Sequence, residues 1–329
     1  MTLHVHISHP PKEQYRAYFE QRLDTGISVT YGAEVPNPPR YQILVAGRPR
    51  REELEASPNL RALIIPWAGL PEETAELMAE FPHVSIHNLH YNAAATAETA
   101  LALLLAAAKF IVPIDRAFRR HDWTLRYELP PIVTLEGRTA CILGFGAIGR
   151  RIARYCRALG MEVLALRRRS NVIPTEEDEV EVYGPDALHQ VLARSHVLII
   201  AAPLTAETRG LIGAQELSLL RSPALLVNVG RGPIVQEKAL YNALKSGQLL
   251  AAGIDVWYDY PADKSQRSHH PPSSLPFHEL DNVVMSPHRG GAQGTPDSEK
   301  RRYAELATVL NAAARGKELP NRIILERGY

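Results

Sequence analysis

The sequence predicts an α/β protein built from two doubly wound domains, each a parallel sheet covered by helices. Along most of the chain, short apolar runs of strand length alternate with segments of helical periodicity, which is typical of βαβ units. The later runs are almost continuously apolar, as expected of strands that helices cover on both faces. With 329 residues, the chain is too long for one typical domain and long enough for two separate cores.

The first part of the chain predicts a small domain of five strands with interleaved helices. The apolar runs that we expect to form strands cover residues 3–8, 27–31, 41–46, 61–66 and 84–88. Helical patterns lie between them, near residues 11–23, 51–56 and 71–80.

A second series of elements follows a long, alanine-rich helix that we expect from about residue 92 to 110. Its strands are predicted at residues 139–145, 161–166, 196–202, 224–230, 249–256 and 282–287. Residues 295–315 have a helical pattern. The proline-rich stretches 35–39 and 261–276 are expected to be loops, and the second is long enough to suggest a functional excursion.

The composition excludes several classes of protein. With 37 basic and 36 acidic side chains, the chain has no overall field that would draw it to nucleic acid or to an anionic membrane. The N-terminus lacks the basic and apolar regions of a signal peptide, and the longest apolar stretch, residues 100–108, is too short to span a bilayer. Cys141 and Cys156 fall within a strand pattern and a helical pattern, which fits a reducing compartment. We expect a cytoplasmic protein without nucleic-acid or membrane partners.

No metal site is expected. The tightest histidine cluster comprises His83, His87 and His90, but Pro82 and the strand-like VSIH pattern are incompatible with helical ligand spacing.

A glycine-rich turn predicts a dinucleotide site. Residues 144–149 spell GFGAIG, directly after an expected strand and at the start of an expected helix. In this pattern Gly144 allows a tight turn, Gly146 lets the backbone approach a pyrophosphate, and Gly149 allows close packing of helix and strand. The N-terminus of the helix offers N–H groups to the phosphates. The other residues of the motif, Phe145, Ala147 and Ile148, are candidate cofactor contacts as well. The alternative is a structural glycine turn in an unrelated α/β protein.

Three consecutive arginines predict the type of cofactor. Where NAD-binding proteins place an acidic residue for the ribose 2′-hydroxyl, about 20 residues beyond the first glycine, this chain has Arg167, Arg168 and Arg169. A guanidinium group matches a phosphate in charge and geometry. We therefore expect NADP(H) as the preferred cofactor, with NAD(H) as the second possibility; a solvated surface run is the alternative.

Two further segments place polar groups just after expected strands. Arg231 lies between two glycines just after an expected strand, where its guanidinium could hold a substrate carboxylate. His288, in NVVMSPHRGG, ends another expected strand. An ordinary salt-bridge arginine and a structural strand-end histidine are the alternatives.

Taken together, these motifs resemble those of the D-isomer-specific 2-hydroxyacid dehydrogenases. GFGAIG, AAPLTAETRGLIG, VNVGRGPIV, AAGIDV and SPHRGG occur in the order and approximate spacing of that family, over nearly the whole chain. The resemblance implies a flavodoxin-like substrate domain, residues 1–98 and 290–329, with a Rossmann-type dinucleotide domain, residues 99–289, inserted into it. It also implies an active site in the cleft between the domains, and a homodimer.

The resemblance assigns roles to individual residues. It implies hydride transfer between nicotinamide and a small D-2-hydroxy or 2-keto acid, similar to glyoxylate and hydroxypyruvate reductases. Arg231 would bind the carboxylate and the carbonyl group, and His288 would donate a proton to the developing alkoxide. Substrate contacts are expected at Trp67, Ala68 and Gly69. Asp255 resembles the acidic residue near the nicotinamide carboxamide, and the remaining candidate cofactor contacts are Ala202, Pro203, Thr208, Val229, Gly230 and Gly290.

One position departs from the family pattern. The family commonly has a glutamate five residues after the position of Asp255, where it orients the histidine, but this chain has Tyr260. We expect the Tyr260 hydroxyl to hydrogen-bond His288, although a neutral phenol stabilises imidazolium less than a carboxylate does; Asp259 is the alternative partner. Because related formate dehydrogenases also lack the glutamate, formate-like or other atypical hydride transfer stays open, as does a nucleotide-sensing, corepressor-like protein with little turnover.

Overall fold

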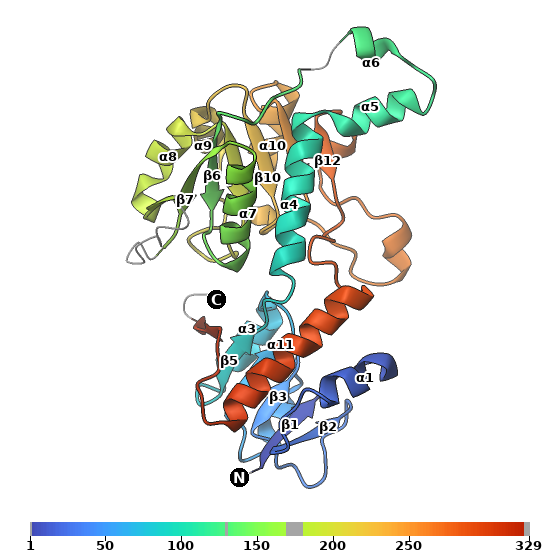
Figure 1. Cartoon of the computed structure of the whole chain (residues 1–329), viewed down its shortest axis with the longest axis vertical. Helices are drawn as coiled ribbons and strands as arrows, with labels where there is room; N and C mark the ends of the chain where they lie inside the picture. The colour runs from blue at the N-terminus through green and yellow to red at the C-terminus, as the bar shows by residue number, and fades with distance from the viewer. Residues whose placement is uncertain (1, 129–130, 169–179, 326–329) are drawn as a thin grey trace. The chain divides into compact units, whose positions relative to one another are not determined.

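The computed structural model describes residues 2–128, 131–168 and 180–325 (Figure 1). The chain divides into two compact units, the first comprising Met1–Asn92 and Ala292–Tyr329 and the second Ala93–Gly291. The boundary that we expected at residue 98 falls within helix α4 (Ala93–Ala108), because that helix packs along its length in the second unit. Both units are α/β with parallel sheets, which confirms the predicted fold class.

Unit 1 has a six-stranded sheet in the order β13-β5-β4-β3-β1-β2. Strands β1 to β5 follow the flavodoxin-like order 2-1-3-4-5 and are parallel, whereas β13 pairs antiparallel to β5. All five predicted strands are present: β1 (Leu3–Ile7), β2 (Ile27–Tyr31), β3 (Ile43–Val45), β4 (Ala62–Ile65) and β5 (Ser85–Asn88). Strand β13 (Arg322–Ile323) is new, because two residues are too few to carry a periodic pattern.

Helices cover both faces of this sheet. One core cluster contains residues of α1 (Glu13–Glu20) and α11 (Pro296–Ala314), and the other contains residues of α2 (Arg51–Glu55) and α3 (Glu72–Met78). Helix α11 begins where the sequence predicts, because Thr295 accepts a hydrogen bond from the Ser298 N–H and Pro296 occupies the first helical position.

Unit 2 has a seven-stranded parallel sheet in the order β12-β11-β10-β9-β6-β7-β8, which is the Rossmann order with one additional strand. The six predicted strands are observed as β6 (Thr139–Leu143), β7 (Glu162–Leu166), β9 (Val197–Ile200), β10 (Leu225–Asn228), β11 (Ala251–Ile254) and β12 (Val283–Met285). Edge strand β8 (Glu181–Tyr183) was not predicted, because its three residues are partly exposed and carry no apolar run.

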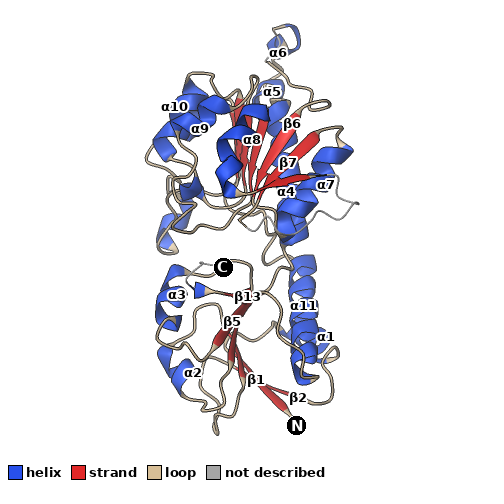
Figure 2. Cartoon of the chain, turned by 90° about the vertical axis from the view of Figure 1, so that its left-hand side faces the viewer, coloured by secondary structure: helices blue, strands red, loops and turns tan. Residues whose placement is uncertain are grey.

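Helices also cover both faces of the second sheet (Figure 2). One core cluster joins α4 and α7 (Ala147–Ala158) to the sheet, and the other joins α8 (Leu188–Arg194), α9 (Ala214–Leu219) and α10 (Glu237–Lys245). Gly253 of β11 allows α4 to approach the sheet closely: a Cβ atom there would lie 2.7 Å from Cβ of Leu103.

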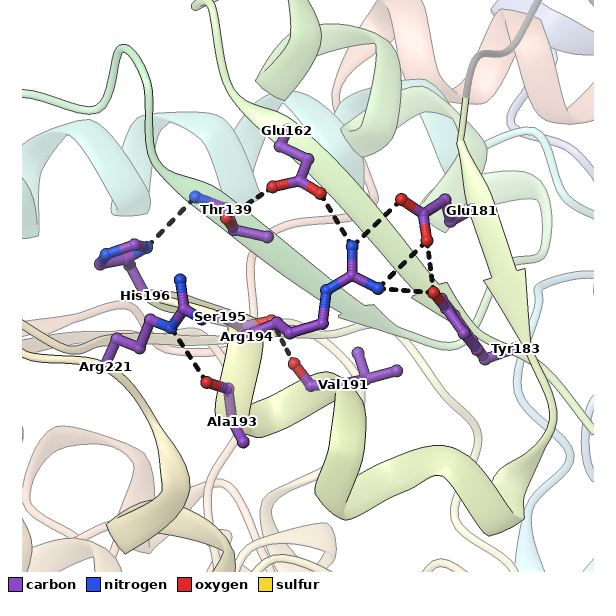
Figure 3. A network of polar contacts seen from close by, with 10 residues as sticks. All are labelled: Thr139, Glu162, Glu181, Tyr183, Val191, Ala193, Arg194, Ser195, His196 and Arg221. Carbon is purple, nitrogen blue, oxygen red and sulfur yellow. Dashed lines mark hydrogen bonds and ion pairs between the residues drawn. The ribbon is translucent and has the colours of Figure 1, made fainter.

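A polar network fastens edge strand β8 to its neighbours (Figure 3). The Arg194 guanidinium, at the end of α8, lies 3.0 Å from the carboxylate of Glu162 and 3.1 Å from that of Glu181, the first residues of β7 and β8. It also lies 2.6 Å from the Tyr183 hydroxyl. At the opposite end of β8, the Tyr183 carbonyl accepts the Arg167 N–H at 2.9 Å. The network therefore holds β8 in place, and β8 in turn binds the backbone of Arg167, the first residue of the arginine run.

After α4 the chain forms two short helices, α5 (Ile111–Phe118) and α6 (Thr124–Tyr127), which extend away from the rest of unit 2 (Figure 1). Seven large hydrophobic side chains are exposed in the described part of the chain, and five belong to this segment: Ile111, Phe118, Trp123, Tyr127 and Ile132. We call the described residues of this segment, 111–128 and 131–132, the apolar arm.

By length and apolar composition, no single helix among the described residues could cross a membrane; the pair α4 and α5, bent by 65° at its break, passes such a test only when counted together.

Candidate active site

The predicted dinucleotide turn lies between β6 and α7, and its three glycines differ in their surroundings. Gly144 has φ +101°, and a Cβ atom there would lie 2.6 Å from the backbone N of Ala202. A Cβ atom at Gly149 would lie 2.0 Å from the Gly144 carbonyl oxygen, so helix and turn are in direct contact. By contrast, nothing lies within 4 Å of a Cβ position at Gly146. Two glycines are therefore needed for packing, while the third leaves space for a ligand.

The start of α7 is suited to an anion. Gly146 is its N-cap residue, and no side chain caps the first turn. The N–H groups at the start of a helix have no partner within the helix, and they carry the positive end of its dipole. Phe145 is buried, whereas Ala147 and Ile148 are partly exposed at this end. The turn thus fits the pyrophosphate of a dinucleotide.

The arginine run begins where β7 ends. Arg167 follows the last strand residue and is half-buried, and Arg168 is exposed. The charge of Arg168 reaches the loop after β9, since the pKa of Glu207 is lowered by a hydrogen bond from Thr205 and, to a smaller extent, by Arg168. Arg169 lies outside the described residues.

The loop after β9 packs against the glycine turn. Ala202 approaches Gly144, as described above, and Pro203 accepts a 2.8 Å hydrogen bond from the Thr208 hydroxyl. From the next strand, the Val229 N–H donates to the Ile200 carbonyl, and the Gly230 N–H donates to the Asn228 side chain at 3.0 Å. These candidate cofactor residues therefore gather at the carboxyl ends of the strands, the usual ligand-binding edge of such sheets.

Arg231 follows β10 at the same edge. The Asn228 side chain fixes its backbone by donating to the Arg231 carbonyl at 3.0 Å, and the Arg231 guanidinium donates to the Gly230 carbonyl at 2.7 Å. Burial lowers the pKa of Arg231, but a guanidinium remains charged in proteins. Within residues 2–128, 131–168 and 180–325, no carboxylate forms an ion pair with it. A largely buried cation in this situation is suited to binding an anion.

Asp255 holds the turn that carries His288. Its buried carboxylate, in a residue 1% exposed, accepts hydrogen bonds from the Ser286 hydroxyl and from the N–H groups of Arg289 and Gly290, both at 2.9 Å. His288 itself has φ +56°, an unfavourable conformation for a residue with a side chain. The bonds to Asp255 help to offset this strain. Sequence reasoning missed this anchoring role, for which the polar Ser286 was the available signal.

Tyr260 contacts His288. The Tyr260 hydroxyl lies 3.0 Å from Nδ1 of His288 and also accepts a 3.0 Å hydrogen bond from the Trp257 N–H. The expected hydrogen bond is therefore present, whereas the alternative partner, Asp259, lies 3.2 Å from Nε2 of His270. Burial lowers the pKa of His288, the Arg231 charge lowers it further, and Asp255 opposes them. Burial raises the pKa of Tyr260. Near neutral pH the pair is therefore uncharged.

The expected substrate contacts of unit 1 follow strand β4. The Ala68 carbonyl accepts a 2.6 Å hydrogen bond from the Asn88 side chain, and the Trp67 ring lies against Gly47, where a Cβ atom would overlap it. Gly69 is partly exposed. Their contact with a substrate stays a prediction.

The central histidine of the predicted cluster, His87, has hydrogen-bond partners on both ring nitrogens. Nδ1 of His87 lies 2.8 Å from the Pro320 carbonyl oxygen and Nε2 lies 3.0 Å from the Ser85 hydroxyl. Over the described residues, no group of three or more acidic, histidine or cysteine side chains is arranged to hold a metal ion.

A family model described as "D-isomer specific 2-hydroxyacid dehydrogenase, NAD binding domain" matches residues 101–290. The glyoxylate reductase of Aeropyrum pernix is 38% identical over 234 residues, which cover 70% of this chain and 66% of that protein. The D-3-phosphoglycerate dehydrogenase of Archaeoglobus fulgidus is 34% identical over 255 residues, which cover 76% of this chain and 45% of that protein. The chain thus aligns with less than two thirds of the length of either relative.

Solved structures show the same fold. A D-isomer specific 2-hydroxyacid dehydrogenase from Xanthobacter autotrophicus Py2, in complex with NADPH and MES, superposes with a TM-score of 0.78 at 25% identity, covering 100% of this chain and 99% of that one. An NADPH-dependent glyoxylate/hydroxypyruvate reductase from Sinorhizobium meliloti, in complex with NADP and sulfate, superposes with a TM-score of 0.77 at 20% identity, covering all of both chains.

Proposed function

Because the chain belongs to the D-isomer specific 2-hydroxyacid dehydrogenase family, we propose that it is an NADP(H)-dependent reductase of small 2-keto acids with D-2-hydroxy acids as products. The observation that carries this proposal is the placement of Arg231. Its largely buried cation lies at the same sheet edge as the dinucleotide turn and close enough to His288 to lower the pKa of that imidazole. Arg231, the proposed binder of the substrate carboxylate, and His288, the proposed proton donor, are therefore close to each other.

Arg231 binds the substrate carboxylate in this proposal. A buried charge without a counterion is costly, and an incoming carboxylate offsets that cost through a pair of charge-assisted hydrogen bonds. The same guanidinium polarises the neighbouring carbonyl group, where negative charge develops during reduction. Backbone N–H groups at Ala68 and Gly69 are the proposed second contact of the carboxylate, with Trp67 as a wall of the pocket.

The glycine turn and the arginine run hold the cofactor. Gly146 and the N-terminus of α7 receive the pyrophosphate, while Arg167 and Arg168 bind the 2′-phosphate that distinguishes NADPH from NADH. The loops at Ala202–Thr208 and Val229–Gly230 complete the proposed contacts. When bound, the reduced nicotinamide supplies the hydride for the carbonyl carbon.

His288 supplies the proton. Its imidazole protonates the substrate oxygen as the carbonyl group is reduced, and Tyr260 positions the ring through Nδ1. Asp255 keeps the 286–290 turn in place, and with it the histidine.

A substrate panel tests this proposal. Consumption of NADPH and of NADH is measured with glyoxylate, hydroxypyruvate, pyruvate and other 2-keto acids. In the oxidative direction, formation of NADPH or NADH is measured with formate and NADP⁺ or NAD⁺. We expect sustained turnover of a 2-keto acid with NADPH. Turnover of formate alone would identify the atypical dehydrogenase, and NADPH binding without turnover would identify a nucleotide-sensing protein.

The chain also acts as a homodimer in this proposal, and the apolar arm supports it. Five exposed hydrophobic side chains in one short segment are more than an isolated subunit usually leaves to solvent, and a second copy of the arm is a partner of matching character. Light scattering coupled to gel filtration should give twice the chain mass for the wild type. The variant Phe118→Ser/Trp123→Ser should shift toward one chain mass. A wild type of single chain mass would contradict the dimer.

A further inference from the structure

The hydroxyl group of Tyr260 has two polar neighbours, the Trp257 N–H and Nδ1 of His288. The Trp257 backbone N–H, 3.0 Å away, is solely a donor, so the Tyr260 oxygen must accept from it. The second neighbour, Nδ1 of His288, is also 3.0 Å away and can accept. While its oxygen accepts from Trp257, the phenol can direct its own hydrogen at Nδ1, in which case the neutral imidazole carries its hydrogen on Nε2.

A carboxylate at this position would produce the opposite arrangement. An ionised Asp or Glu side chain only accepts, so it would keep a hydrogen on Nδ1 and leave Nε2 with a free lone pair. With Tyr260, neutral His288 instead presents an N–H donor at Nε2. Since burial and the Arg231 charge lower the pKa of His288, the neutral form of the ring predominates at neutral pH. A donor that acts through the neutral ring would then not depend on the imidazolium form.

We propose that Tyr260 is a proton donor that acts through neutral His288. The inference rests on the proposed function. As the substrate oxygen gains negative charge, the Nε2–H bond breaks and that proton moves to the oxygen. In the same step the Tyr260 O–H bond breaks and its proton moves to Nδ1, so the imidazole remains neutral and the tyrosine becomes a phenolate. Water then reprotonates the phenolate, and exchange with solvent restores the hydrogen on Nε2.

Some of the surroundings of Tyr260 favour this role. The residue is 45% exposed, which gives the phenolate access to water. Burial has the largest effect and raises the pKa of Tyr260, and Asp255 adds to it, whereas the Trp257 N–H and the Arg231 cation oppose that shift by favouring the phenolate. Asp255 does not compete for His288, because both of its oxygens are engaged by the 286–290 turn. Among the described residues, the charged or titratable groups that act on the histidine are Arg231, Asp255 and Tyr260.

Nitrogen NMR of the ¹⁵N-labelled full chain tests the arrangement without any substrate. The His288 signals are assigned by their loss in His288→Gln, and a pH titration gives the pKa of the ring. Above that pKa, we expect a protonated Nε2 and an unprotonated, hydrogen-bonded Nδ1. In Tyr260→Phe, the Nδ1 signal should move toward that of an unbonded nitrogen. A hydrogen on Nδ1 in the wild type, or an Nδ1 signal unchanged in Tyr260→Phe, would overturn the inference.

The pH dependence of reduction tests the proton transfer. With NADPH and the best 2-keto acid, kcat/KM of the wild type should stay level above the pKa measured for His288. In Tyr260→Phe it should fall about tenfold for each pH unit above that pKa, because imidazolium is then the only donor. Tyr258→Phe is the matched control, since the Tyr258 hydroxyl donates to the Val235 carbonyl instead, and its pH profile should follow the wild type.

A wild-type profile that falls with the titration of His288, or identical profiles in the wild type and Tyr260→Phe, would overturn the relay. If no 2-keto acid is reduced at all, the proposed function fails, and the NMR result alone decides the donor role of Tyr260.

Discussion

The buried carboxylate of Asp255 accepts a 2.9 Å hydrogen bond from the backbone N–H of Gly290, two residues beyond His288. A Cβ atom at position 290 would lie 2.6 Å from the same oxygen, so the turn fits closely around the carboxylate. This contact connects the end of β11 to the turn after β12. The position of the proposed proton donor therefore depends on an acidic group that is not itself required to contact the substrate.

Asp255→Asn should destabilise the protein and reduce turnover. The amide group would direct N–H donors at the backbone N–H groups of the turn, leaving at least one buried donor unpaired at a cost of about 1–3 kcal/mol. Urea unfolding measures the loss. Asp259→Asn is the control, since the Asp259 carboxylate is 62% exposed, and it should change the free energy of unfolding by less than about 0.5 kcal/mol. Equal effects of the two substitutions would contradict the anchoring role.

Two glycines of the dinucleotide turn should separate binding from stability. Gly146→Ala places a methyl group in open space, so the variant should keep the wild-type Tm but lose affinity for NADPH. Gly149→Ala places a methyl group 2.0 Å from the Gly144 carbonyl, so it should lower Tm. Thermal unfolding and quenching of tryptophan fluorescence by NADPH measure the two quantities. A Gly146→Ala variant that binds NADPH like the wild type would show that the open space is not the cofactor site.

Arg167→Asp should reverse the cofactor preference. Loss of a charge-assisted hydrogen bond to the 2′-phosphate, about 1.5–3 kcal/mol, corresponds to about a 10- to 100-fold rise in KM for NADPH. KM for NADH should change little or fall, because an acidic side chain suits the 2′-hydroxyl. The KM for NADH of the same variant thus serves as the control for its KM for NADPH. An unchanged ratio of the two KM values would mean that the arginine run is merely solvated.

Stability should decrease on mild acidification. Burial lowers the pKa values of His6, His87, His196 and His288 in the folded chain. The unfolded chain, with histidine pKa values of about 6.5, then binds more protons than the folded chain, so stability is lost as the pH falls through that value. Urea unfolding at pH 7.5 and 5.5 should give the lower free energy at pH 5.5. Equal free energies at the two pH values would contradict the direction of these shifts.

Much of the fold could be predicted from the sequence, because buried parallel strands leave long apolar runs. All eleven strands with such runs were found, and only β8 and β13, which are two or three residues long and lie at sheet edges, were missed. The apolar arm was also not anticipated. Its aromatic residues show no periodicity, and their exposure depends on the path of the chain after α4.

The parts of the site that residue type and spacing define, such as the glycine turn, could be predicted from the sequence. The parts that depend on three-dimensional contacts were harder to predict. Tyr260 was expected to contact His288, but the direction of its hydroxyl hydrogen depends on the backbone N–H of Trp257. The anchoring role of Asp255 likewise depends on backbone N–H groups in a turn from a distant part of the chain. Apart from the polar Ser286, which donates to Asp255, side-chain patterns carry no information on these backbone contacts.

In the proposed function, Arg231 selects substrates that carry a carboxylate next to the carbonyl group. The most direct test compares kcat/KM for NADPH-dependent reduction of glyoxylate with that of acetaldehyde, which replaces the carboxylate by a methyl group, in the wild type and in Arg231→Gln. The wild type should favour glyoxylate by at least about 100-fold, corresponding to about 3 kcal/mol of charge-assisted binding, and Arg231→Gln should lose most of that preference while remaining as stable as the wild type. A wild type that reduces both substrates equally, or an Arg231→Gln variant that keeps the full preference, would contradict the account.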